Sequence, residues 1–224
     1  MTAISTDPFP HVCIDDFLPT DYAAIAHRCF PEPHSDVWKT PENAHTHAKS
    51  VIQGLKYAQF SPEVRPVFDY LNSAVTLKRL HDLFGIDGLI GDPYFVEGGY
   101  HRIGREGFLD IHADFSHHDI TGLERRLNLI LYLNPGWQHE WGGELRLYDR
   151  DLRAQASFEP IYNRAVLFET SETSYHGHPE PLACPQGEYR KSIAMYYYTI
   201  PRPWRTRRLA HFPTDPNFQY RSGA

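Results

Sequence analysis

The sequence lacks the cysteines that stabilise disulfide-rich proteins and cysteine-type zinc domains. It has 3 cysteines in 224 residues and no C-x-x-C pair, which excludes a disulfide scaffold and a cysteine-type zinc site and suits a reducing compartment. No apolar run approaches the length of a membrane span, and the first residues do not read as a signal peptide. We therefore expect a cytoplasmic protein that has no membrane partner.

Positive charge is scarce as well. The formal net charge is −6 at pH 7, which argues against a nucleic-acid partner. The C-terminal run Arg202, Arg205, Arg207 and Arg208 is a local exception. Two interpretations of it stay open, namely a solvated tail or an anion-binding rim for a charged substrate. We expect a small-molecule or peptidyl substrate, and a chain that is a monomer or a homodimer.

Aromatic residues are plentiful, at 14%, which favours strands and lined pockets over long solvated helices. From residue 89 onward, short apolar segments are separated by breaks that contain glycine or proline. Eight such segments favour a sandwich or a barrel. We predict strands in LIGDPYFVE, YHRIG, GFLDIHAD, RLNLILYLN, GELRLYD, RAVLFET, SYHGH and YRKSIAMYYYTI.

The first 88 residues are of a different kind. HVCIDDFLPTDYAAIAHRCF predicts a short strand, a turn at Pro19 and a helix with Thr20 or Asp21 as its N-cap. Residues 31–50 have no periodicity and predict an exposed loop. Residues 61–84 have apolar residues at helical spacing, with an early interruption at Pro66 and a stop at Gly85.

The expected fold is therefore α+β and mainly β. Its core is a double-stranded β-helix, the jelly-roll or cupin-like barrel, with the N-terminal helices packed on one sheet. We expect a single domain over 1–224, with helical and loop support in 1–88, the barrel in 89–200 and a tail in 201–224.

The segment DIHADFSHH, residues 110–118, raises the question of a metal site. Side chains on a strand alternate between its two faces, so His112 and Asp114 share one face. The alternation ends after Asp114, and we expect His117 and His118 in a loop at the mouth of a pocket. The role of Asp110 stays open.

An H-x-D pair needs a third ligand from another strand, and His176 is the best placed. It follows a strand and a turn, and Gly177 after it permits a close backbone approach. His178 is followed by a proline and is expected to leave the strand. Two histidines and one carboxylate with open positions are typical of non-haem Fe(II) oxygenases. Zinc hydrolases also use this set, although the helical H-E-x-x-H of many of them is absent.

A second site is predicted on the strand that begins near residue 190. Arg190 and Ser192 share a strand face, and a guanidinium with a neighbouring hydroxyl can bind a carboxylate. The alternative is that Arg190 pairs with a glutamate of another strand.

Together these residues resemble the Fe(II)/2-oxoglutarate-dependent dioxygenases, and most closely their prolyl 4-hydroxylase-like branch. The resemblance rests on H-x-D at 112–114, the distal His176 and R-x-S at 190–192, and it covers about residues 90–200. RRLNLILYLN followed by Trp137 and GGELRL is a further feature of that branch, and HVCIDDFLP resembles its N-terminal lead-in.

The resemblance implies a role for each matching position. The catalytic residues, which would also hold the metal, are His112, Asp114 and His176. The residues that would bind 2-oxoglutarate are Arg190, Ser192, Tyr132, Asn128 and Tyr100. Residues expected to meet the substrate are Arg102, Arg105, His117 and Trp141, although the two arginines can also be read as ordinary surface charges.

The expected cofactor is Fe(II), with 2-oxoglutarate and O2 as co-substrates. The expected reaction hydroxylates an unactivated C–H bond and releases succinate and CO2. The presence of Asp114 favours hydroxylation, since related halogenases have a small residue there. A small metabolite is the preferred substrate, and a prolyl or peptidyl substrate is the alternative. A cupin-like metal hydrolase or isomerase, or a non-catalytic ligand-binding barrel, remains a rival.

Overall fold

A computed structural model describes residues 3–39, 46–51, 57, 60–203, 207, 210–214 and 219–220. None of the helices in this part of the chain is long and apolar enough to cross a membrane. The helices are α1 (Thr20–Arg28), α2 (Arg65–Leu71), α3 (Ala74–Phe84) and the 3-10 helix η2 (His139–Trp141). The strands are β1 (His11–Ile14), β2 (Thr46–Val51), β3 (Gly99–His112), β4 (Glu124–Tyr132), β5 (Leu145–Tyr148), β6 (Ala154–Phe158), β7 (Ala165–Glu169), β8 (Tyr175–His178), β9 (Tyr189–Thr199), β10 (Ala210–His211) and β11 (Gln219–Tyr220).

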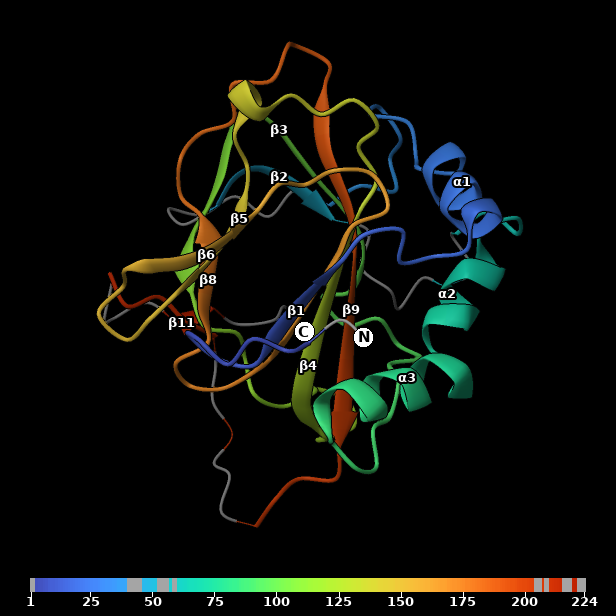
Figure 1. The fold of residues 1–224 in the computed structure, drawn as a ribbon. Coiled ribbons are helices and arrows are strands. Elements are labelled where there is room, and N and C mark those ends of the chain that lie inside the picture. The colour runs from blue at the N-terminus through green and yellow to red at the C-terminus, as the bar shows by residue number, and fades with distance from the viewer. Residues whose placement is uncertain are drawn as a thin grey trace.

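Nine of the strands form one curled antiparallel sheet. Its order is β1-β7-β4-β9-β3-β8-β5-β6, and β2 is added beside β3. The sheet wraps around an interior, while α1, α2 and α3 lie together on one side of it (Figure 1). Strands β4, β9 and β3 are adjacent, so residues far apart in sequence meet on the inner face of the barrel.

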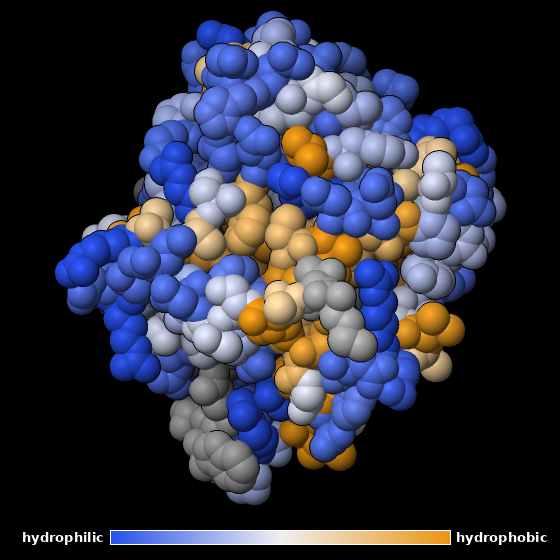
Figure 2. Space-filling model, in the orientation of Figure 1, coloured by the Kyte–Doolittle hydropathy of each residue, from blue (hydrophilic) through white to orange (hydrophobic). Residues whose placement is uncertain are grey.

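On strand β4, one face packs in the hydrophobic core and the other lines a cavity. Leu127, Leu129 and Leu131 belong to the main hydrophobic core, together with buried residues of α2. Asn128 and Ile130, which alternate with those leucines, line a cavity on the other face. On the face drawn in Figure 2, hydrophobic residues gather toward the middle, in the region of β1, β4 and β9, and hydrophilic residues surround them.

The N-terminal helices differ in part from the sequence prediction. The expected helix over 61–84 is two helices, because Ser73 caps a new one: its hydroxyl accepts a hydrogen bond from the Thr76 amide at 3.3 Å. Pro66 lies in the first turn of α2, where a missing N–H does no harm. Gly85 ends α3 with φ of 66°, as a C-terminal glycine should. The N-cap of α1 is Pro19, without a side-chain cap, rather than Thr20 or Asp21.

Several strand predictions also need correction. Residues 46–50, expected in an exposed loop, belong to β2 because β3 offers them a partner edge. YHRIG and GFLDIHAD are one long strand, and LIGDPYFVE contributes an isolated bridge between Ile90 and Tyr198 instead of a strand. The strand β6 was not predicted. Its five residues pair with β5 and are largely exposed, so they carry little hydrophobic signal.

The C-terminal segment is more than a solvated tail. Arg202 pairs with the fully buried Glu124, and Arg207 pairs with Asp119. Farther along, Ala113 and His211 exchange two backbone hydrogen bonds of 2.8 Å. Arg205 and Arg208 lie outside the described residues, so the interpretation of an anion-binding rim stays a prediction.

Candidate active site

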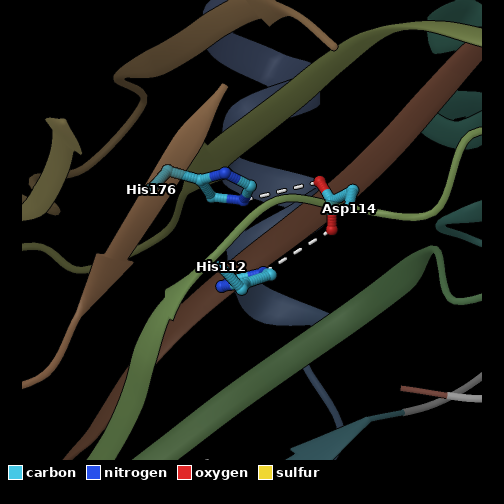
Figure 3. A group of neighbouring side chains, drawn as sticks. All are labelled: His112, Asp114 and His176. Atoms are coloured by element: carbon cyan, nitrogen blue, oxygen red, sulfur yellow. Dashed lines mark ion pairs between the residues drawn. The ribbon is translucent and has the colours of Figure 1, made fainter. Parts of the chain in front are cut away.

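The structure brings His112, Asp114 and His176 together on the inner face of the barrel. His112 ends β3 and is paired in register with His176 of β8, and their ring centroids are 4.3 Å apart. Asp114 follows β3 and lies beside the two rings, with one carboxylate oxygen toward each (Figure 3). Its Oδ1 is 3.5 Å from Nε2 of His112, and its Oδ2 is 3.4 Å from Nε2 of His176.

Gly177 explains how β8 comes so close to β3. A Cβ atom at this position would lie 2.8 Å from the carbonyl oxygen of Asp110 and 2.9 Å from that of Leu109. Those are backbone atoms that cannot move aside, so any side chain here would push the strands apart. The close approach that brings His176 to His112 therefore depends on glycine.

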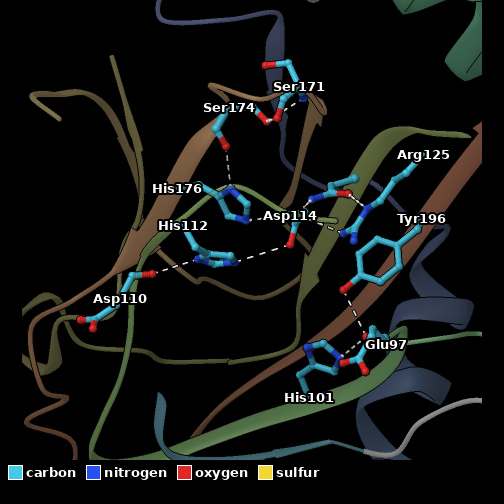
Figure 4. A network of polar contacts seen from close by, with 11 residues as sticks. Glu97, His101, Asp110, His112, Asp114, Arg125, Ser171, Ser174, His176 and Tyr196 are labelled. Atoms are coloured by element: carbon cyan, nitrogen blue, oxygen red, sulfur yellow. Dashed lines mark hydrogen bonds and ion pairs between the residues drawn. The ribbon is translucent and has the colours of Figure 1, made fainter. Parts of the chain in front are cut away.

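Backbone carbonyls fix the orientation of both rings. Nδ1 of His112 lies 2.9 Å from the carbonyl oxygen of Asp110, and Nδ1 of His176 lies 3.0 Å from that of Ser174. A carbonyl oxygen only accepts hydrogen bonds, so each Nδ1 carries the proton and each Nε2 keeps a lone pair (Figure 4). This is the arrangement that metal-binding histidines require. It also gives Asp110 a role through its backbone.

Asp114 is held from the opposite side by Asn128 and Arg125. Its Oδ2 accepts hydrogen bonds from Asn128 Nδ2 at 2.6 Å and from Arg125 Nη2 at 3.1 Å. Arg125 Nε also donates to Asn128 Oδ1 at 2.8 Å, so the three side chains form one network. The guanidinium is 3.5 Å from the ring centre of Tyr196 and 4.5 Å from that of Phe115. Asp114 thus has a fixed position in a buried site.

The electrostatics keep Asp114 and His176 ready to bind a cation. Burial opposes the ionisation of Asp114, but Arg125 and then His176 outweigh it and hold the pKa of Asp114 well below its usual range. Burial, followed by the neighbouring His112, lowers the pKa of His176 to about 4. At neutral pH the site therefore offers an ionised carboxylate and an unprotonated His176.

Two imidazole nitrogens and one carboxylate oxygen, within 4.8 Å of one another, form a set that fits a divalent metal of the iron type. The ring orientation and the two hydrogen bonds to Asp114 support the same conclusion. His139, Glu144 and Glu159 make a second such group, but it lies at the surface, and an ion pair of 2.6 Å between His139 and Glu159 accounts for it.

A cavity of about 70 Å³ extends from these ligands toward Arg190. Arg190 is buried, donates from Nε to the Gly143 carbonyl at 2.7 Å and from Nη2 to the Tyr132 hydroxyl at 2.9 Å. Arginine only donates, so the Tyr132 oxygen accepts and its own O–H stays available. Ser192 lines the cavity and is the register partner of Tyr132. Among the described residues, no ion pair involves Arg190.

Asn128 and Tyr100 were both expected among the residues of the 2-oxoglutarate site, with Asn128 near the iron end. Asn128 lines the cavity, and its amide is bonded to Asp114 at the metal end. Tyr100 lies in the hydrophobic core, where its hydroxyl donates to the Ala26 carbonyl at 3.0 Å. That expectation for Tyr100 was wrong, because alternation on β3 directs His101 and Ile103 into the cavity and Tyr100 away from it.

The residues expected to meet the substrate do not gather at the cavity. Arg102 faces the outer side of β3, and Arg105 donates to the Cys184 carbonyl at 2.9 Å. Trp141 packs edge-to-face on Trp137, with ring centroids 5.1 Å apart.

His117 and His118 are buried rather than solvated. His117 is hydrogen-bonded to the neighbouring Ser116 at 2.8 Å, and His118 pairs with the buried Asp92 at 3.1 Å. The predicted loop is present, but it is packed against the protein, and neither side chain is among those that line the cavity.

Other residues belong to the site although the sequence did not indicate them. His101, His178 and Tyr196 line the cavity. His178 stays in β8 although a proline follows it, so the expectation that it leaves the strand was wrong. Tyr196 donates to the Glu97 carbonyl at 3.1 Å, and His101 is bonded to the same carbonyl at 2.9 Å. Alternation along β3, β8 and β9 would have found all three.

Comparisons with known proteins agree with this geometry. Residues 98–198 match the model of the 2OG-Fe(II) oxygenase superfamily. Prolyl 3-hydroxylase OGFOD1 of Mus musculus is 38% identical over an alignment of 115 residues, and the match covers 46% of this chain and 21% of that protein. The chain thus spans about a fifth of the length of the curated relatives it matches.

Two solved structures have the same fold. A Pseudomonas putida prolyl-4-hydroxylase matches with a TM-score of 0.57 and 20% identity, over 84% of this chain and 92% of that one. A Trichoplax adhaerens prolyl hydroxylase in complex with a hypoxia inducible factor peptide fragment matches with a TM-score of 0.54 and 18% identity, over 84% and 83%.

Residues 98–198 belong to the 2OG-Fe(II) oxygenase superfamily, and the barrel and its His-Asp-His site fit that class of enzyme. The chain has the same fold as these two solved prolyl hydroxylases. The resemblance, the mainly β fold with a jelly-roll core and the expected Fe(II) and 2-oxoglutarate are thereby confirmed.

Proposed function

We propose that the protein hydroxylates a prolyl residue of a peptide or protein, using Fe(II), 2-oxoglutarate and O2. The observation that carries the reaction class is one cavity with His112, Asp114 and His176 at one end and Arg190 with Ser192 at the other. The prolyl hydroxylases among the relatives support a peptidyl substrate over the small metabolite that the sequence favoured. The whole protein's substrate is part of this proposal.

Each end of the cavity has a defined task. His112, Asp114 and His176 would hold the iron, and the guanidinium of Arg190 would pair with the distal carboxylate of 2-oxoglutarate. The Tyr132 hydroxyl can donate to the same carboxylate, since Arg190 occupies only its lone pair. The chemistry that iron and 2-oxoglutarate supply when bound is the use of O2 to hydroxylate an unactivated C–H bond, with succinate and CO2 as products.

The chain's own residues also exclude side reactions. Asp114 is tied by Arg125 and Asn128, so its carboxylate cannot swing away from the metal position. Leu145, Ile103 and Leu109 line the cavity and keep it partly apolar, which limits the water that reaches the reacting atoms. A metal hydrolase would have no use for Arg190 and Ser192 at the far end.

The test is a screen of the purified chain with Fe(II), 2-oxoglutarate and O2. Proline-containing peptides and a panel of small metabolites are compared for succinate release, and products are examined by mass spectrometry for the addition of one oxygen atom. We expect a peptide to be hydroxylated at proline. The matched peptide with alanine at that position and the Asp114→Ala variant should give no product. Oxygen incorporation into a metabolite, with none into any peptide, would contradict the peptidyl proposal.

A further inference from the structure

A second hollow lies on the outer side of the same two strands that carry the active site. It has a volume of about 310 Å³ and lies between β3, β9 and the C-terminal end of α1 with the loop that follows it. Its volume is at the lower end of the range for small-molecule sites. Its lining residues are His27, Arg28, Phe30, Pro31, Glu32, Pro33, Arg102, Gly187, Tyr189 and Lys191.

Two positively charged residues on neighbouring strands line this hollow. Arg102 of β3 and Lys191 of β9 are direct partners in the antiparallel register, and both line it. Like charges directly opposite each other on neighbouring strands destabilise a sheet. The alternating neighbours Arg190 and Ser192 face the other cavity, so the two hollows lie back to back across β9.

Arg102 is held rigidly in place. Its guanidinium carbon is 4.5 Å from the ring centre of Trp38 and 4.9 Å from that of Tyr189, and its Nη1 donates to the Pro33 carbonyl at 2.6 Å. Burial lowers the pKa of Arg102, a sign that its charge is partly removed from water. An arginine fixed between two aromatic rings has already lost much of its conformational entropy, so a ligand would not need to order it.

Among the described residues, no ion pair includes Arg102 or Lys191, and Arg28 is paired with Glu63. Glu32 is the acidic residue among those that line the hollow, and it has no ion pair with either cation. Burial and then the charge of Lys191 lower the pKa of His27, so the hollow also disfavours a further positive charge.

We propose that this hollow binds a small phosphate-type dianion between Arg102 and Lys191. The planar fork of arginine matches two phosphate oxygens, and the lysine ammonium acts as a compact point charge on a third. The ligand would relieve the repulsion between the two strands. This site is separate from the iron and 2-oxoglutarate site and does not depend on the proposed hydroxylation.

Calorimetric titration of the full chain in a phosphate-free buffer tests the proposal. Inorganic phosphate and glycerol phosphate are titrated separately, because the free ion and a phosphate monoester share the same chemistry. The stronger of the two ligands identifies the source. Binding should persist with unchanged affinity at saturating 2-oxoglutarate, since the two sites are distinct. Arg102→Gln and Lys191→Gln should each weaken binding about tenfold or more. Arg105→Gln, on the same strand but outside the hollow, should leave it unchanged.

Thermal unfolding gives a second readout. Without phosphate, Lys191→Gln should be at least as stable as the wild type, because it removes the repulsion of Arg102. Phosphate should raise the melting temperature of the wild type and not that of Lys191→Gln. The proposal is overturned if neither anion binds the wild type, if both variants bind as tightly as the wild type, or if 2-oxoglutarate displaces the phosphate.

Discussion

Removing the Tyr132 hydroxyl is the sharpest test of the co-substrate site. Tyr132 is fully buried in β4, and Tyr132→Phe deletes one oxygen without changing the shape of the ring. The hydroxyl accepts a 2.9 Å hydrogen bond from Arg190, whose guanidinium carbon also lies 4.8 Å from the centre of the ring. The substitution therefore leaves the ring contact in place and removes only the polar one.

The expected effect follows from two hydrogen bonds. The O–H of Tyr132 would donate to the carboxylate of 2-oxoglutarate, and a hydrogen bond to a charged group contributes about 1.5–3 kcal/mol. The affinity for 2-oxoglutarate should therefore fall about 10- to 150-fold. Arg190 also loses one acceptor, which should cost about 1–2 kcal/mol of folding stability. Ser192→Ala removes another hydroxyl donor to the same charged carboxylate, so it should weaken binding by a comparable factor, about 10- to 150-fold.

The assay is an anaerobic titration of 2-oxoglutarate into the Fe(II) protein, followed by the visible absorption of the complex, with iron content measured in parallel. Iron binding should be unchanged in Tyr132→Phe. Tyr148→Phe is the matched control, since it deletes the hydroxyl of another buried tyrosine that lies on β5 and outside the cavity. An unchanged affinity would refute the donor role of Tyr132, and a loss of iron would mean that the hydroxyl supports the metal end instead.

Three further predictions concern the frame of the site. Gly177→Ala should weaken iron binding about tenfold or more in a metal titration, because its Cβ would meet two backbone carbonyls at less than 3 Å. Phe212→Ala should also weaken iron binding, since its ring stacks on the His112 ring with centroids 5.3 Å apart. Glu124→Gln should lower the unfolding free energy at pH 7 by about 1–3 kcal/mol in a urea titration. Arg202 holds the pKa of Glu124 below its ordinary value of 4.5 despite burial, so this contribution is present above about pH 4.5 and is lost as the pH falls further. Equal stability of the two proteins at pH 7 would contradict that assignment.

The metal ligands could be predicted because their geometry is local. His112 and Asp114 are two residues apart at the end of a strand, and the period of a strand is enough to place them on one face. His176 needed one more step, the return of another strand, and Gly177 marked where a close approach is permitted.

The hydrogen bond from Arg125 to Asp114 could not be predicted from the sequence in the same way. Strict alternation from Asn128 along β4 would direct Arg126 toward the site. The register of β4 with β9 shifts between Arg125 and Leu127, so Arg125 reaches Asp114 instead. A bulge of this kind depends on the partner strand, and no pattern within RRLNLILYLN indicates it.

For Tyr100 the prediction was wrong, although strand alternation within β3 would have placed this residue correctly. The resemblance placed it at the co-substrate, whereas alternation from Ile103 puts it on the core side of β3. Strand β2 is different again, because its six residues have no strand pattern of their own and are ordered by pairing with β3.

Side chains along β3 and β9 alternate between two faces, so the same two strands line both the inner cavity and the outer hollow. Arg190 and Ser192 face the inner cavity, while Lys191 between them faces the outer hollow beside Arg102. A slip of β9 by one residue would exchange these faces and place a lysine where the co-substrate carboxylate is expected. The register pairs Tyr132 with Ser192 on one side of β9 and Arg102 with Lys191 on the other. Both pairs depend on the same register of β9. A variant that shifts β9 should therefore lose 2-oxoglutarate binding and phosphate binding together. Lys191→Gln, which keeps the register, should lose only the second.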